Sequence, residues 1–390
     1  MVADTDSSFD AVPGSYSPLL SVLAHYPPDC APRAWTKATS GFSGAEVYRL
    51  ETPRGTLALR RWPAEHPSPE RLTWIHTVLT QAVANGFDRL PLPIPIVVAF
   101  ESNGVPLLRR SSAGNSCGDT FVLHDGHLWE LAPWLPGDAD FHRNPNPARL
   151  TAAMQALAQL HLAMANVQPN SPLQDTVRFG PSPGLAARLT QLRGLLSGGA
   201  AAIRSAVAGV PDPGESASTP ASLRPATEFR ATVGLPSSAL LDAAQEVLTH
   251  FERLVPDLER QLGANVDRPV PLQPTLRDIH DEHVLFVGDQ VTGIIDFGAM
   301  RFETVAGDIA RLLGSLVTND PAGWQAGLSA YESLRPLSDT ERELVPLFDR
   351  SGLLLGGMNW LEWLFVARRQ FADLARVRAR LDAILARLRV

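Results

Sequence analysis

Residues 275–298 read TLRDIHDEHVLFVGDQVTGIIDFG, and this stretch departs from the helical period of the sequence on either side. Its two β-rich runs, 284–287 and 291–295, are joined by Gly-Asp-Gln, which is typical of a hairpin turn. Asp278 lies in the loop before the first run, and Asp296 comes directly after the second. Because a hairpin brings its outer ends together, we expect the two carboxylates to be neighbours. Two close carboxylates beside a glycine and a loop suit a divalent cation and a general base.

The part of the chain before Gly137 shows strand-like runs separated by turn signals. The expected strands lie at 35–39, 46–50, 56–62, 96–100 and 118–123. A helical stripe from Leu72 to Val83 follows the third strand, and the run 127–137 is interpreted as an exit strand into a linker. The order β-β-β-α-β-β predicts a five-stranded antiparallel sheet with one helix.

Beyond Gly137 the sequence pattern is mainly helical. The expected helices lie at 148–165, 185–196 and 237–262, with more in the last third of the chain. Residues from about 169 to 236 are rich in Pro, Ser, Gly and Ala and are interpreted as a low-complexity insertion. We therefore predict an α+β protein with a leader (1–32), an N-terminal lobe (33–137) and a helical C-terminal lobe (138–390).

Composition excludes several classes of protein. With 390 residues, 45% hydrophobic and 19% charged, the chain is expected to fold into two or three domains. A formal net charge of −7 argues against nucleic acid as the main partner, and two cysteines are too few for a disulfide scaffold. The first ten residues lack the features of a secretory signal, and the most apolar stretch, 353–366, is too short to span a membrane. We expect a cytoplasmic protein without a membrane partner.

The central stretch also resembles a known family. Asp278, the hairpin, Asp296-Phe-Gly and the following Gly307-Asp308 occur in the order of the catalytic core of the aminoglycoside phosphotransferase and choline kinase family, distant relatives of protein kinases. The resemblance covers roughly Thr36 to Leu316. It implies a bilobal, protein-kinase-like fold and an enzyme that transfers the γ-phosphoryl group of ATP to a hydroxyl of a small molecule. The acceptor would be an aminoglycoside, choline, homoserine or a sugar-like compound.

The resemblance also implies a role for each site residue. Asp278 would be the catalytic carboxylate that orients the acceptor hydroxyl and accepts its proton, and Asp296 would hold magnesium at the ATP phosphates. Arg60 would stand in the place of a phosphate-binding lysine, and the segment from Leu131 to Trp134 would be the hinge that binds adenine. The nucleotide-binding residues implied in this way are Gly41, Ser43, Gly44, Arg60, Ala132 and Trp134.

Three positions depart from the family pattern. His283, five residues after Asp278, stands where the family has a metal-binding asparagine, and imidazole suits zinc or manganese better than magnesium. Mn²⁺ is therefore a possible replacement for Mg²⁺. Arg60 is a bulkier cation than lysine. The helix after Arg60 offers His76 where a glutamate partner is expected, with Glu70 as the alternative.

These departures leave other functions open. His283 and Arg60 are consistent with a nucleotide-binding pseudokinase or regulatory protein, and the doublet His280-Asp281 near His283 with a metal phosphohydrolase. Structural roles are open too, since His280 could pack under the loop. Asp308 could be a helix N-cap, and the resemblance implies that it also braces the loop of Asp278; the two roles are compatible.

Overall fold

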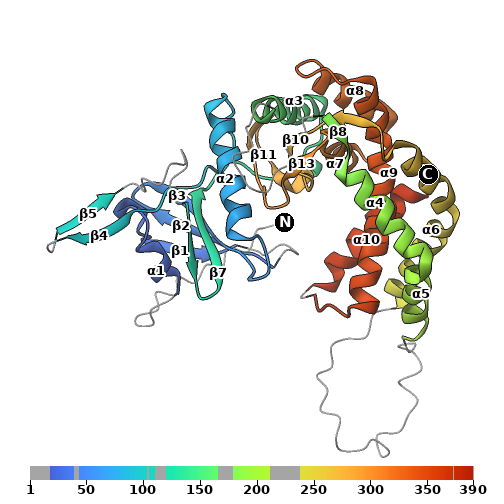
Figure 1. Ribbon diagram of the computed structural model, residues 1–390, viewed down its shortest axis with the longest axis horizontal. Coiled ribbons are helices and arrows are strands. Elements are labelled where there is room, and N and C mark those ends of the chain that lie inside the picture. Colours follow the sequence, from blue (N-terminus) through green and yellow to red (C-terminus); the bar gives the residue numbers. More distant parts are fainter. Residues whose placement is uncertain are drawn as a thin grey trace, which may run out of the picture. The chain divides into compact units, whose positions relative to one another are not determined.

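The protein is seen in a computed structural model that forms two compact units (Figure 1). One unit comprises Met1–Thr80 and Pro91–Leu135, and the other Gln81–Leu90 and Pro136–Val390. The structure describes residues 18–38, 44–102, 105–109, 120–165, 179–210, 238–371 and 373–389. The predicted fold class is confirmed, since the first unit holds a five-stranded antiparallel sheet and the second is mostly helical.

The sheet of the N-terminal unit has the strand order β1-β2-β3-β7-β6, with every pair antiparallel. Its strands are β1 (Ala34–Lys37), β2 (Glu46–Thr52), β3 (Gly55–Arg61), β6 (Phe121–His124) and β7 (His127–Pro133). The predicted meander of the first three strands is therefore present.

The fourth strand and the exit strand were assigned wrongly. The expected strand at 96–100 corresponds to β4 (Val98–Ser102), which pairs with β5 (Val105–Arg109) in a separate hairpin. The expected exit strand is instead β7, which lies between β3 and β6. Its buried residues Leu128, Trp129, Leu131 and Ala132 cover both of its faces, as expected for an inner strand. The spacing of apolar residues along the sequence shows that such a run is buried, but it does not show which strands the run pairs with.

Part of the expected leader belongs to the core of this unit. Helix α1 (Pro18–Leu23) and the short 3-10 turn η1 (Pro28–Cys30) bury Leu19, Val22 and Cys30 in one cluster with sheet residues such as Leu59 and Leu131. Apolar side chains removed from water stabilise the fold, so the described part of 1–32 is structural. Helix α2 (Pro69–Ala84) follows β3 as predicted, and the boundary between the two units falls within it.

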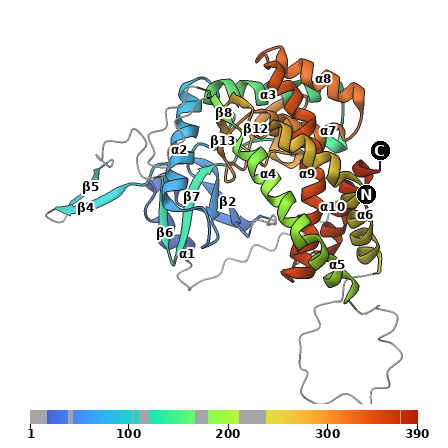
Figure 2. The same cartoon turned by 45° about the vertical axis from the view of Figure 1, so that its right-hand side comes forward.

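The described part of the C-terminal unit is built of helices together with three short strand pairs. Its helices are α3 (Pro147–Met164), α4 (Pro183–Gly194), α5 (Ala200–Ala208), α6 (Ser238–Asn265), α7 (Ala306–Val317), α8 (Pro321–Glu332), α9 (Asp339–Leu361) and α10 (Leu374–Leu388). Its strand pairs are β8 (Phe179–Pro181) with β9 (Pro269–Pro271), β10 (Gln273–Thr275) with β13 (Arg301–Glu303), and β11 (Val284–Val287) with β12 (Gln290–Ile294). Figure 2 shows α4, α6, α9 and α10 side by side, and α9 also packs on α7.

The helix predicted at 185–196, within the segment of about 169–236, is present as α4. The described part of this segment, 179–210, contains α4 and α5, which bury Leu185, Leu192, Ile203 and Val207. The stretch 211–237, which holds most of the low-complexity sequence, lies outside the described residues. Helix α5 was not predicted, because its many small residues give little apolar periodicity. No helix in the described ranges combines the length and the apolar character that crossing a membrane requires.

Candidate active site

The predicted hairpin is present and carries Asp296 to the loop that holds Asp278. Strands β11 and β12 pair antiparallel, and Gly288 in their turn has a left-handed φ of 58°. The N–H of Ile295, directly before Asp296, donates a 3.0 Å hydrogen bond to the carbonyl of His283. The end of β12 is thereby joined to the 3-10 turn η6 (Asp281–His283), which follows Asp278.

Asp308 holds the other end of this loop. Its two carboxylate oxygens accept 2.7 Å hydrogen bonds from the backbone N–H groups of Leu276 and Arg277. Nε2 of His161 lies 3.1 Å from Oδ2 of Asp308, and burial lowers the pKa of His161, so the neutral ring donates this bond. The N-cap of α7 is Val305, so Asp308 does not cap the helix. It braces the backbone just before Asp278 instead, with only 1% of its own surface exposed.

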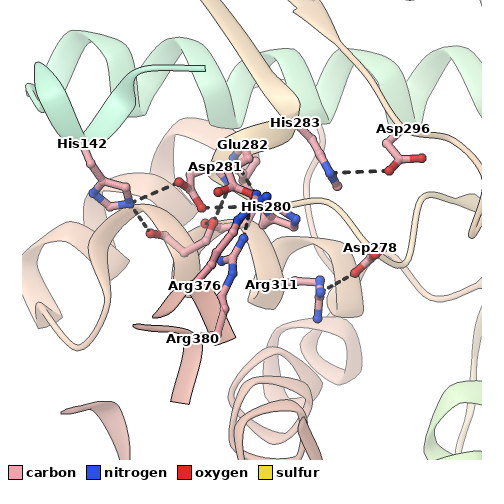
Figure 3. Close-up of polar contacts among 12 residues, drawn as sticks. His142, Asp278, His280, Asp281, Glu282, His283, Asp296, Arg311, Arg376 and Arg380 are labelled. Atoms are coloured by element: carbon pink, nitrogen blue, oxygen red, sulfur yellow. Dashed lines mark hydrogen bonds and ion pairs between the residues drawn. The ribbon is translucent and has the colours of Figure 1, made fainter. Parts of the chain in front are cut away.

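The carboxylate of Asp278 is accessible and faces a cation. Its Oδ1 forms an ion pair with Nη2 of Arg311 on α7 (Figure 3). Both side chains are about half exposed, at 48% and 47%. Backbone bracing together with an open carboxylate is suited to a group that must contact a ligand.

His283 and Asp296 form the second part of the site. Nε2 of His283 lies 3.6 Å from Oδ2 of Asp296, and the two point toward each other (Figure 3). Burial and the adjacent charge of His280 lower the pKa of His283 to about 4, although the carboxylates of Asp296 and Asp278 act in the opposite direction. The ring is therefore neutral at physiological pH. Nδ1 of His283 is buried and lacks a hydrogen-bond partner among the described residues.

These two side chains fit a divalent cation. A neutral imidazole nitrogen and a carboxylate oxygen are both metal donors, and they face one another. The described residues contain no group of three or more His, Cys, Asp and Glu side chains arranged to hold a metal. A cation held here would thus take most of its ligands from water or phosphate, as Mg²⁺ commonly does.

The doublet His280-Asp281 has structural contacts. Nδ1 of His280 accepts a 3.3 Å hydrogen bond from the N–H of Glu282, and its ring stacks on that of His283 with centroids 3.9 Å apart. Oδ2 of Asp281 lies 3.5 Å from Nε2 of His142, and its N–H donates to Oγ of Ser315 at 2.9 Å. Neither contact involves Asp296. This arrangement gives no support to the phosphohydrolase hypothesis.

Arg60 has a different partner from those predicted. Its Nε lies 3.8 Å from Oε1 of Glu130, the residue directly opposite on β7, and its guanidinium stacks on Trp62 at 4.7 Å. Nε2 of His76 lies 2.6 Å from Oε2 of the same Glu130. His76 and Arg60 are thus linked through the carboxylate of Glu130, which lies on strand β7.

The alternative partner, Glu70, is wrong. Its side chain is exposed, and its pKa is lowered by hydrogen bonds to its own backbone and to Ser68, with no contribution from Arg60. Sequence reasoning missed Glu130 because it lies seventy positions from Arg60. The only available signal was the pairing of β3 with β7, which local patterns do not give.

The remaining predicted nucleotide contacts are in part outside the described residues. Gly41 and Ser43 are among those not described, whereas Gly44 is exposed with a left-handed φ of 76°. Ala132 is buried in β7 opposite Ala58. The N–H of Trp134 donates a 3.0 Å hydrogen bond to the carbonyl of Thr56. That N–H group is therefore already bonded within the N-terminal unit.

Comparison with known proteins identifies the family. Residues 34–344 match the phosphotransferase enzyme family, APH. The chain belongs to this family. It is similar to the homoserine kinase of Agrobacterium fabrum, at 29% identity over 119 residues, or 29% of this chain and 37% of that kinase. It is also similar to the homoserine kinase of Methylocella silvestris, at 33% identity over 112 residues, or 27% of this chain and 35% of the other. These matches span little more than a third of each relative.

Solved structures of the family share the fold. Spectinomycin phosphotransferase APH(9)-Ia, in complex with ADP and spectinomycin, superimposes with a TM-score of 0.58 over 94% of this chain and 95% of its own, at 11% identity. Amicoumacin kinase, in complex with AMP-PNP and Ca²⁺, gives a TM-score of 0.50 over 93% and 90%, at 14% identity. These likenesses establish the protein-kinase-like fold.

Proposed function

We propose that the protein transfers the γ-phosphoryl group of ATP to a hydroxyl group of a small molecule. The observation that carries this proposal is the loop of Asp278, which Asp308 fixes through two backbone hydrogen bonds while the Asp278 carboxylate stays open. Membership of the phosphotransferase family supports the same reaction.

In this proposal Asp278 is the general base. Its carboxylate orients the acceptor hydroxyl and takes its proton as the acceptor oxygen forms a bond to the γ-phosphorus and ADP leaves. Asp296 and His283 would hold Mg²⁺ or Mn²⁺, which neutralises charge on the phosphates when it is bound. His283 supports this role because Nε2 of its neutral ring faces Asp296.

Arg60 would contact the phosphates from the N-terminal unit. Glu130 and Trp62 hold its guanidinium on β3, so the side chain is positioned before a nucleotide binds. Gly41, Ser43 and Gly44 would lie over the phosphates, and Ala132 and Trp134 would lie beside the adenine without using the Trp134 N–H.

A direct assay would identify the class of acceptor. The relatives suggest L-homoserine and spectinomycin as acceptors, and the family resemblance adds choline. Each compound is incubated with labelled ATP and either Mg²⁺ or Mn²⁺, with detection of the phosphorylated product. We expect turnover of at least one compound, and its loss in Asp278→Asn. Binding of ATP by calorimetry, without turnover of any compound, would favour a nucleotide-binding regulatory protein instead.

A further inference from the structure

Three arginines of the C-terminal unit bear on the site of Asp278, since two adjoin Asp278 and their charges act on the third. Arg311 forms an ion pair with Asp278 and keeps about half of its side chain exposed. Arg277 directly precedes Asp278, is exposed, and has a left-handed φ of 65°. The bond from its N–H to Asp308 holds this conformation, which side chains other than glycine rarely adopt.

The third arginine, Arg188 on α4, contacts a phenylalanine that packs against α7, the helix of Arg311. Its guanidinium lies 4.5 Å from the ring centroid of Phe348, and Nη1 donates a 3.2 Å hydrogen bond to the carbonyl of Gly184. Phe348 also packs on α7, since a Cβ at Gly307 would lie 3.4 Å from its ring. Gly307 and Arg311 are one helical turn apart on the same face of α7. Phe348 thus connects Arg188 with the turn of α7 that precedes Arg311.

The charge of Arg188 is not neutralised by a direct partner. In the parts of the chain that the structure describes, no carboxylate lies within 4.0 Å of its guanidinium. The acid whose charge acts on it is Glu303, whose oxygens already accept bonds from Oγ of Ser182 and the N–H groups of Gly184 and Thr304.

The positive charges of Arg277 and Arg311 act on Arg188. Burial lowers the pKa of Arg188 to about 10, and the charges of Arg277 and Arg311 act in the same direction. Arg188 still carries its charge at neutral pH. Partly buried cations that repel one another are stabilised by an anion placed among them, and arginine binds carboxylate and phosphate through its fork of N–H donors.

We infer that Arg188, Arg277 and Arg311 bind an anionic group of the acceptor whose hydroxyl Asp278 activates. This inference rests on the proposed function and narrows its substrate class to hydroxylated acids, such as a hydroxy amino acid or a phosphorylated alcohol. Choline and aminoglycosides are disfavoured, because a cationic acceptor would add to the repulsion. An anion in this place also releases Arg311 from Asp278, which leaves the carboxylate free for the hydroxyl.

The first test measures anion binding and needs no turnover. Inorganic phosphate is titrated by calorimetry into the full-length protein and into Arg188→Gln and Arg277→Ser. We expect each variant to weaken phosphate binding at least tenfold. Arg193→Gln is the matched control, since it removes one arginine from the same helix α4, and its exposed side chain pairs only with Glu259 among the described residues. It should bind phosphate like the wild type. Equal phosphate affinity in all four proteins would overturn the inference.

The second test separates the two sources of an anion. The phosphate titration is repeated in the presence of saturating AMP-PNP and Mg²⁺. Retained binding assigns the arginines to the acceptor, whereas complete loss would assign them to the nucleotide phosphates and refute the inference. Because Arg277 is exposed, Arg277→Ser keeps the test informative if Arg188→Gln does not fold.

A third test distinguishes this inference from the proposed function. L-homoserine and its primary amide, which lacks the carboxylate charge, are compared as acceptors. We expect the KM of L-homoserine to be at least tenfold lower than that of the amide, and Arg277→Ser to remove the difference without changing the KM of ATP. Preferred turnover of the amide or of choline would leave the kinase proposal intact and contradict the anionic acceptor.

Discussion

The two units differ in how the residues that depart from the family pattern are bonded. In the N-terminal unit, Arg60 and His76 replace the expected lysine and glutamate, and the carboxylate of Glu130 contacts both. Both ring nitrogens of His76 are bonded, since Nδ1 also lies 2.5 Å from Oγ1 of Thr120. In the C-terminal unit, His283 is buried with Nδ1 unbonded in the described structure.

This difference distinguishes positions where the fold supplies another partner from a position whose side chains suit a ligand. A buried polar atom without a partner costs about 1–3 kcal/mol, so folds normally provide one. In the N-terminal unit the carboxylate comes from a strand instead of the helix, and it contacts both Arg60 and His76. In the C-terminal unit Nε2 of the neutral His283 ring faces the carboxylate of Asp296, and this arrangement suits a cation held between them.

The largest expected effect tests the C-terminal unit directly. Asp278→Asn removes the proposed base, and we expect kcat to fall by about 10²–10⁴-fold while ATP affinity changes little. Steady-state rates and calorimetric titration with AMP-PNP measure the two quantities. Asp339→Asn is the control, since that side chain is 96% exposed. A parallel loss of nucleotide affinity in Asp278→Asn would contradict the assigned role.

The second prediction concerns the compensation in the N-terminal unit. Glu130→Ala leaves Arg60 and His76 without their shared carboxylate, so we expect unfolding free energy to fall by about 1–3 kcal/mol and the KM of ATP to rise about tenfold. Urea denaturation and ATP kinetics measure both. Glu70→Ala is the matched control, because it removes the exposed glutamate at the start of α2. If the two variants behave alike, the contact of Glu130 with Arg60 has no role in nucleotide binding.

The sequence predicts contacts between residues that are close together in the chain better than contacts between residues that are far apart in it. The hairpin, Asp296 and the bracing residue Asp308 follow from motifs within a short stretch, and the hairpin placed Asp296 beside the catalytic loop as expected. The Arg60–Glu130 contact depends on the pairing of β3 with β7, and the Arg188–Phe348 contact joins α4 to α9. Neither leaves a local pattern, because side chains that meet only through tertiary packing follow no sequence period.

The third prediction tests whether His283, which faces Asp296, is a metal ligand. If His283 is a metal ligand, the wild type should favour Mn²⁺ over Mg²⁺, and His283→Asn should shift that preference toward Mg²⁺ by about tenfold, since amide oxygen is a harder ligand than imidazole. Binding of Mn²⁺ in the presence of AMP-PNP, followed by electron paramagnetic resonance, gives a readout independent of turnover. His142→Gln provides a control at a half-exposed histidine nearby. An unchanged Mn²⁺ to Mg²⁺ ratio would assign His283 to packing, and the contrast between the two units would disappear.

The smallest expected effect concerns the helix that supports the catalytic loop. Oε2 of Glu282, in the turn after Asp278, lies 2.6 Å from Nη2 of Arg380 and 3.5 Å from Nη2 of Arg376, both on α10 (Figure 3). The three side chains are 35–43% exposed. Ion pairs of this exposure contribute about 0–1 kcal/mol, so Arg380→Gln should leave the unfolding free energy nearly unchanged.

Its effect on catalysis should be larger than its effect on stability. Loss of one tether loosens the turn between Asp278 and His283, and a base that is held less precisely loses rate before it loses affinity. We expect kcat to fall about two- to fivefold in Arg380→Gln, with faster hydrogen exchange at residues 278–284. The matched control is Arg378→Gln on the same helix, whose guanidinium pairs with Asp382 and contacts the carbonyl of Ala239 instead of the loop. Equal rates in the two variants would mean that α10 only covers the loop. A slower Arg380→Gln alone would show that the C-terminal unit depends on α10 to position its base, much as the N-terminal unit depends on Glu130 to position its cation.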